Sequence, residues 1–200
     1  MLKNLIWFIF LGYSQLVTAK TCIPNPVLFF HVTTLNGLLS NDVRTITQDR
    51  EGYWWIGTDN GLQRFDGQNF TNFRHEEGNP GSLPSDRIFS VFSDSKGRLW
   101  VATVKGLCRY LPEKGTFKRY ELIANKNILS FPVRIFEDLA GDLWLSHFQS
   151  NLLYRLKSKG SAWEIINLPK GVTTFGAIGQ NKQTGEIIST FRNANGDLFL

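Results

Sequence analysis

The chain has 200 residues, of which 42% are hydrophobic, 14% aromatic and 20% charged, with 18 glycines and a formal net charge of +5. This composition is globular and excludes an intrinsically disordered chain. The charge is modest and no run of five Lys or Arg residues occurs, so nucleic-acid binding is not expected. Many Phe and Trp residues separated by frequent glycines favour short buried strands joined by tight turns.

Residues 1–19 have the three parts of a secretory signal peptide. Lys3 supplies a basic start, the apolar run Leu5–Leu11 follows, and small residues lie near Ala19. The apolar run is short of the roughly 20 residues that span a bilayer, and an uncleaved anchor is the alternative. We therefore expect an exported protein, with residues 20–27 as a short lead-in. Cys22 and Cys108 either form one disulfide or leave Cys108 unpaired.

A motif recurs along the rest of the chain with a period of 44 to 45 residues, and it is centred on a glycine. The fourth copy has Ile188 where the others have tryptophan, and an alternative register on Gly196 breaks the period. The recurring positions, which we interpret as structural, are Asp49, Gly52, Trp55, Thr58, Gly61, Asp94, Gly97, Trp100, Thr103, Gly106, Asp138, Gly141, Trp144 and Gly185.

Each kind of recurring residue has a physical reason for its place. The aspartate, three residues before the glycine, can accept hydrogen bonds from turn amides, and the glycine can take a positive φ. The tryptophans fall on one face of an alternating strand, where they can fill the space between neighbouring sheets. The later glycines mark a second hairpin turn, most clearly in the pair Asn60-Gly61.

Each repeat has room for about four short strands and closes on an aromatic one, at 70–73, 117–120 and 163–166. This pattern predicts an all-β fold made of β-propeller blades of four antiparallel strands. We expect a partial propeller over 28–200, with repeats at about 38–82, 83–128, 129–172 and 173–200, the last one truncated. A lone strand at Leu28–Val32 would belong to a blade completed from elsewhere. The ring would be incomplete, and a native four-bladed ring is the alternative.

The pattern D-x-x-G-x-L-W-[IVL]-x-T followed by G-L-x-R-[FY] resembles the two-component regulator propeller repeat, and the segment Gly37–Asp42 resembles the lead-in to its first blade. The resemblance covers residues 28–200. It implies the periplasmic sensor region of a longer membrane-spanning signalling protein, notably a hybrid histidine kinase. It also implies a homodimeric parent, anchored by a later membrane segment, that senses an oligosaccharide or other small periplasmic ligand.

No convincing catalytic constellation is visible in the sequence. His31, His75 and His147 are far apart and form no metal-binding motif, so neither a metal nor a cofactor is expected. Trp54 has no tryptophan counterpart in the other repeats and is the one candidate for ligand contact, while Tyr53 and Trp163 are better explained as strand residues. An exported polysaccharide lyase or glycosidase and a non-signalling, protein-binding propeller are the alternatives.

Overall fold

A computed structural model describes residues 31–120, 122–124, 127–128, 132–147, 152–160, 162–168, 173–192 and 198–199. The described fold belongs to the unit formed by residues 32–200. The predicted signal peptide, the lead-in 20–27 and most of the strand expected at Leu28–Val32 lie outside the described residues. His31 and Val32, which are described, have no regular secondary structure.

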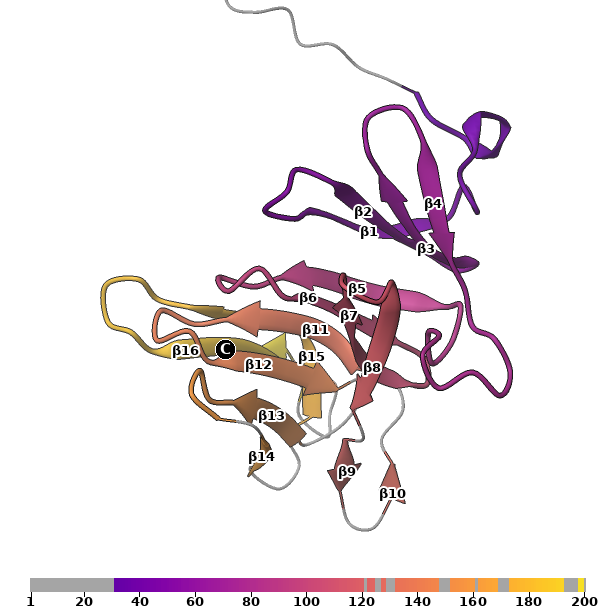
Figure 1. The fold of residues 1–200 in the computed structure, drawn as a ribbon. Helices are drawn as coiled ribbons and strands as arrows, with labels where there is room; N and C mark the ends of the chain where they lie inside the picture. Colours follow the sequence, from indigo (N-terminus) through magenta and orange to yellow (C-terminus); the bar gives the residue numbers. More distant parts are fainter. Residues whose placement is uncertain are drawn as a thin grey trace, which may run out of the picture. The chain divides into compact units, whose positions relative to one another are not determined.

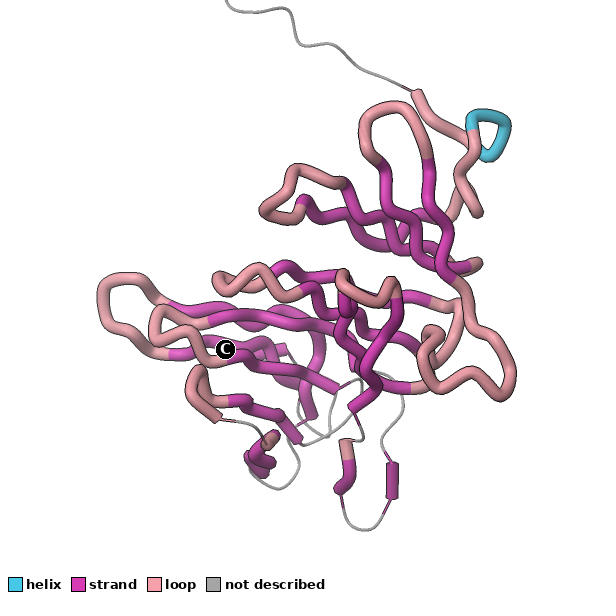
Figure 2. The backbone as a smooth tube through the Cα atoms, viewed as in Figure 1, coloured by secondary structure: helices cyan, strands magenta, loops and turns pink. Residues whose placement is uncertain are grey.

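The described chain is all-β apart from one short 3₁₀ helix, η1 (Thr34–Asn36), which confirms the predicted fold class (Figure 1; Figure 2). Three four-stranded antiparallel sheets follow one another, and each has its strands in sequence order. The first sheet holds β1 (Val43–Gln48), β2 (Trp54–Thr58), β3 (Gly61–Phe65) and β4 (Phe70–Phe73), and the second β5 (Ile88–Ser93), β6 (Leu99–Thr103), β7 (Gly106–Leu111) and β8 (Thr116–Tyr120). The third holds β11 (Pro132–Glu137), β12 (Leu143–His147), β13 (Leu152–Leu156) and β14 (Trp163–Asn167).

Two smaller sheets complete the described elements. A three-stranded sheet holds β15 (Thr173–Gln180), β16 (Ile187–Arg192) and β17 (Leu198–Phe199), and a two-stranded one pairs β9 (Ile123–Ala124) with β10 (Asn127–Ile128). β15 and β16 follow the register centred on Gly185, because Ile188 pairs with Gly179 as Trp144 pairs with Phe136. The Asn181 amide closes the turn on the Glu186 carbonyl at 2.9 Å.

The turn between the first two strands of each sheet has the same backbone conformation. Gly52, Gly97, Gly141 and Gly185 all have positive φ, between 75° and 91°. Each of the first three donates its amide to the carbonyl of the aspartate three residues earlier, at 2.9 to 3.2 Å. A side chain at this φ would be strained, so glycine is required to reverse the chain here.

The hydrophobic core lies between successive sheets. Trp55 from the first sheet packs with Leu99, Val101 and Tyr110 of the second. The next core repeats this arrangement one sheet further on, with Trp100 among residues of the third sheet. Trp55 and Trp100 are each 1% exposed and Trp144 is 9% exposed. The indoles of Trp55 and Trp100 therefore fill the space between neighbouring sheets, as the strand alternation predicts.

The first strand of each of the three complete sheets carries a register shift near its beginning. The shift lies between Val43 and Thr45 in β1, between Ile88 and Ser90 in β5, and between Pro132 and Arg134 in β11. These first strands contact one another from sheet to sheet. A bulge changes the direction of the side chains around it, and in β1 the extra residue is Arg44.

The segment that precedes β1 packs on the first sheet through Gln63, whose side chain is fully buried. Gln63 Oε1 accepts from the Leu39 amide at 2.8 Å, and its Nε2 donates to the Gly37 carbonyl and to Asn72 Oδ1, both at 2.8 Å. These bonds satisfy the buried side-chain amide of Gln63 and anchor the segment that directly precedes β1. Within the described residues, no helix has the length and hydropathy needed to cross a membrane.

Candidate functional site

The recurring aspartate and tryptophan form a direct hydrogen bond in each of the three complete sheets. The carboxylate Oδ2 accepts from the indole Nε1 at 2.6 Å in Asp49–Trp55, 2.8 Å in Asp94–Trp100 and 2.8 Å in Asp138–Trp144. In each sheet Oδ1 accepts the backbone amide four residues after the aspartate, at 2.8 to 2.9 Å. The aspartate thus links the turn to the core. We call the hydrogen bond between its carboxylate and the indole the Asp–Trp clasp.

A guanidinium group covers each of these indoles. Arg64 lies 4.7 Å from the ring centroid of Tyr53 and 5.9 Å from that of Trp55. Arg98 lies 5.3 Å from Trp100, and Arg155 lies 5.2 Å from Trp144. These cation–π contacts shield the edge of the core. A cation on one face of each indole agrees with our interpretation that the recurring positions are structural, which stays a prediction.

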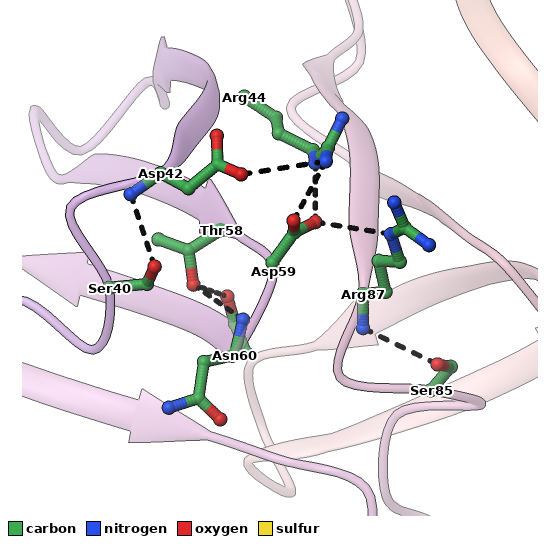
Figure 3. A network of polar contacts seen from close by, with 9 residues as sticks. Ser40, Asp42, Arg44, Thr58, Asp59, Asn60, Ser85 and Arg87 are labelled. Atoms are coloured by element: carbon green, nitrogen blue, oxygen red, sulfur yellow. Dashed lines mark hydrogen bonds and ion pairs between the residues drawn. The ribbon is translucent and has the colours of Figure 1, made fainter.

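A polar network joins the first two sheets at the β2–β3 turn (Figure 3). Asp59 in this turn pairs with Arg44 of β1, which donates through Nε and, at 2.7 Å, through Nη2. Arg87, which precedes β5, reaches the same carboxylate with its Nε at 3.3 Å. Asp42 lies 3.6 Å from Arg44 Nη2. One carboxylate therefore links residues of two successive sheets.

The local turn geometry explains why Asp59 is available for this role. The buried Thr58 hydroxyl donates to the Gly61 carbonyl at 2.9 Å and accepts the Asn60 amide at 3.0 Å, which fixes the turn. The second sheet repeats this geometry at Thr103, whose hydroxyl donates to the Gly106 carbonyl at 3.0 Å. Asp59 is thereby held at the tip, facing the two arginines.

The hydrogen bond from Arg44 lowers the pKa of Asp59 to about 2, against the opposing effect of partial burial. Arg44 in turn has a raised pKa because of the same bond. Asp59 is therefore a carboxylate at neutral pH and has no proton to transfer. The network can hold sheets together and contact a polar ligand. It is not arranged for general acid catalysis.

The aromatic candidates for ligand contact lie in different environments. Trp54 is 41% exposed and lies on the face of β2 opposite to Trp55. Tyr53 is half-buried beneath Arg64, and Trp163 packs edge-on against Trp100 at a centroid distance of 5.9 Å. Of the three, Trp54 keeps an open face, and its role in ligand contact stays a prediction.

The histidines and the cysteines do not meet in the described part of the chain. His75 Nδ1 lies 2.8 Å from the Leu83 carbonyl, His31 is exposed, and the side chain of His147 lies outside the described residues. Within the described residues, no three potential metal ligands lie close enough together to hold an ion. The Cys108 thiol is fully buried, and burial raises its pKa. Cys22 lies outside the described residues, so their pairing stays open.

The network around Asp59 was not predicted from the sequence, because its three main residues come from separate segments and carry no recurring spacing. The Asp–Trp clasp was not predicted either, although a signal for it is present. Each aspartate stands six residues before its tryptophan, in Asp49–Trp55, Asp94–Trp100 and Asp138–Trp144. A constant separation of two side chains that can hydrogen-bond across a turn was enough to predict the contact.

Successive four-stranded antiparallel sheets whose first strands contact one another, with a tryptophan core between them, define a β-propeller. The model of the two-component regulator propeller family matches residues 37–60 and 82–105. Two segments of the chain are therefore similar to repeats of the two-component regulator propeller family.

Known relatives agree with this assignment. The chain is 32% identical over 95 residues to histidine kinase P4 of Formosa agariphila, covering 44% of this chain and 7% of that protein. Its fold matches the extracellular domain of the hybrid two component system BT3049 from B. thetaiotaomicron, with a TM-score of 0.65 and 25% identity over 85% of this chain and 23% of that one. The chain thus spans a small part of the length of these relatives.

An enzyme also shares the fold. Virginiamycin B lyase from Staphylococcus aureus matches 79% of this chain and 54% of its own, with a TM-score of 0.57 and 19% identity. At this identity the similarity concerns the fold alone. It assigns no lyase activity to this chain, because propellers carry many unrelated functions.

Proposed function

We propose that this chain is part of the ligand-sensing propeller of a membrane-spanning two-component signalling protein, acting on the periplasmic side. The observation that carries the proposal is the match of 85% of the chain to an extracellular domain of a hybrid two component system. The similarity to a histidine kinase and the signal-peptide pattern at residues 1–19 agree with it. The chain itself would sense, and kinase activity would belong to a longer parent.

The proposed mechanism is a shift in packing between sheets or between subunits of a homodimeric parent. The Asp59 network joins β1 to the segment before β5, so a ligand that contacts Arg44 or Arg87 would change how the two sheets are held. We propose an oligosaccharide or another small periplasmic molecule as the ligand. Trp54 is a further candidate contact.

Two measurements test the proposal. Reading the gene beyond codon 200 should show further blades, one apolar segment of about 20 residues and histidine-kinase motifs; a stop codon without these features would contradict the signalling role. Edman sequencing of the exported protein should start at Lys20. A start at Met1 on membrane-bound protein would instead favour the uncleaved anchor.

A screen of the whole extracellular region against oligosaccharides tests the sensing step. Addition of a ligand should change the rate of autophosphorylation of the full-length protein in membrane vesicles. Binding without any change in that rate would favour the non-signalling, protein-binding alternative.

A further inference from the structure

A cavity of about 360 Å³ lies at the β6–β7 turn, which in the second sheet is equivalent to the turn that carries Asp59 in the first. Three segments meet there: the connection between β4 and β5, the β6–β7 turn, and β8. The residues that line the cavity include His75, Pro84, Lys105, Leu107, Arg119 and Tyr120. Its volume is in the range of small-molecule sites.

The guanidinium of Arg119 has no carboxylate partner in the described part of the chain. Its Nε donates to the Ser82 carbonyl at 3.2 Å, and its Nη2 to the carbonyls of Asn79 and Leu83 at 2.9 and 3.0 Å. Carbonyl oxygens satisfy these hydrogen bonds but leave the positive charge uncompensated. Nη1 has no hydrogen-bond partner among the described residues.

Lys105 adds to this positive potential, and His75 lies beside it. Lys105 is exposed at the tip of the turn, and its ammonium group makes no ion pair with a described residue. His75 Nδ1 faces the Leu83 carbonyl, so this nitrogen carries the donor hydrogen and Nε2 is left for another contact. Asp86 accepts the His75 amide at 2.6 Å beside the cavity, but none of the described lining residues is an acid.

The remaining wall of the cavity is apolar. Pro84 and Leu107 are buried, and the half-buried Tyr120 ring lies 5.2 Å from Trp100. Lys118 Nζ lies 5.3 Å from the Tyr120 ring centroid, which adds a third cationic group near this wall. The cavity thus combines uncompensated cations with an immobilised aromatic surface.

We propose that this cavity binds a small organic anion. Its charged group would contact Lys105 and Arg119, and its apolar part would lie against Leu107 and Tyr120. A bare inorganic ion would leave the apolar wall uncovered, and a neutral ligand would leave the cations unpaired. The role of this anion as a signal rests on the proposed sensor function, but its binding is measured without any signalling. The two ideas can therefore fail separately.

Benzoate is the probe, because it joins a carboxylate to a flat apolar ring. Titration of the full purified chain, followed by ¹H–¹⁵N NMR, should shift resonances of the β6–β7 turn and β8, and added salt should weaken binding. Lys105→Gln should raise the Kd of benzoate by about fivefold, which corresponds to about 1 kcal/mol. Its side chain holds no described contact, so the variant should fold normally.

Three controls decide the outcome. Lys114→Gln removes the same charge from the exposed β7–β8 turn at the other end of these strands, and should leave the Kd unchanged. Benzamide, the neutral analogue, should not bind measurably. Inorganic phosphate should bind more weakly than benzoate. Equal binding of benzamide, equal binding of phosphate, equal effects of the two lysine variants, or no benzoate binding would each overturn the proposal.

Discussion

Asp94 Oδ2 accepts a hydrogen bond from Trp100 Nε1 at 2.8 Å, and both residues are buried. The bond connects the turn between β5 and β6 to the core between the second and third sheets. The same carboxylate also organises the turn, because its Oδ1 accepts the amides of Lys96 and Arg98 at 3.0 and 2.8 Å. A single side chain therefore determines both the turn and the position of the indole.

Replacement of this aspartate should be strongly destabilising. Asp94→Ala leaves the Trp100 indole N–H and the turn amides without acceptors, and it removes the partner of Arg98 Nε. We expect a loss of about 3 kcal/mol in the free energy of unfolding, measured by urea denaturation. The reason is that unsatisfied buried donors cost more than the bonds themselves contribute.

Asp66→Ala is the matched control. Asp66 accepts the amides of Gln68 and Asn69 at 2.8 and 2.6 Å in the β3–β4 turn, but it is exposed and has no tryptophan partner. Its replacement should cost much less than that of Asp94, because its acceptor role is shared with water. Equal losses for Asp66→Ala and Asp94→Ala would show that the indole contact contributes nothing.

Gly57 should not tolerate a side chain, although its φ is not positive. A Cβ at this position would lie 2.6 Å from the side chains of both Thr45 and Ile88, which belong to two different sheets. Gly57→Ala should therefore cost about 2 kcal/mol through overpacking between β2 and β5. Gly179→Ala, where a Cβ would meet nothing within 4 Å, is the control and should be neutral. A neutral Gly57→Ala would mean that the first two sheets are packed more loosely.

The Asp59 network should make stability depend on pH in the acid range. The hydrogen bond from Arg44 lowers the pKa of Asp59 from 3.8 to about 2. A carboxyl whose pKa is lowered by folding stabilises the protein above its unfolded pKa of about 4, and this contribution is lost as the pH falls through about 2. Because Asp59 is partly exposed, solvent screening limits the effect to about 1 kcal/mol.

Comparison with Asp59→Asn isolates this contribution. Wild type should be more stable than the variant at pH 7, and the difference in free energy of unfolding should shrink toward pH 2. Glu113→Gln changes an exposed carboxylate that has no hydrogen bond to a described residue, and it should show no such trend. If the difference in free energy of unfolding between wild type and Asp59→Asn stays constant with pH, the ion pair with Arg44 does not cause it.

Features that follow from strand alternation or a recurring spacing were predictable from the sequence, and contacts between segments without such a spacing were not. Strand alternation and the glycine spacing indicated the positive φ of Gly97 and the buried face of Trp100, because both depend on neighbouring residues. The pairing of Asp59 with Arg87 joins residues 28 apart and depends on how two sheets stack. The cavity at Lys105 and Arg119 was missed for the same reason, since its lining residues come from three segments.

The last residue of a first strand forms a recurring bond to the preceding sheet. Glu137, which ends β11, accepts the Ser95 amide at 2.7 Å, and Gln180, which ends β15, accepts the Leu139 amide at 2.6 Å. Ser95 and Leu139 each directly follow the clasp aspartate of the sheet before. The equivalent residue in β5 is Ser93, which is two bonds shorter than glutamine and makes no such bond among the described contacts.

Ser93→Gln should supply the missing contact. The new side chain can reach the amide of Arg50, which follows Asp49 and has no described partner. We expect a gain of about 0.5 kcal/mol in the free energy of unfolding, because an intersheet hydrogen bond at a partly exposed site contributes little more than this. Ser93→Ala should be neutral. A loss of stability in Ser93→Gln would show that the Arg50 side chain, which packs over Gly97, leaves no room for the amide at this junction.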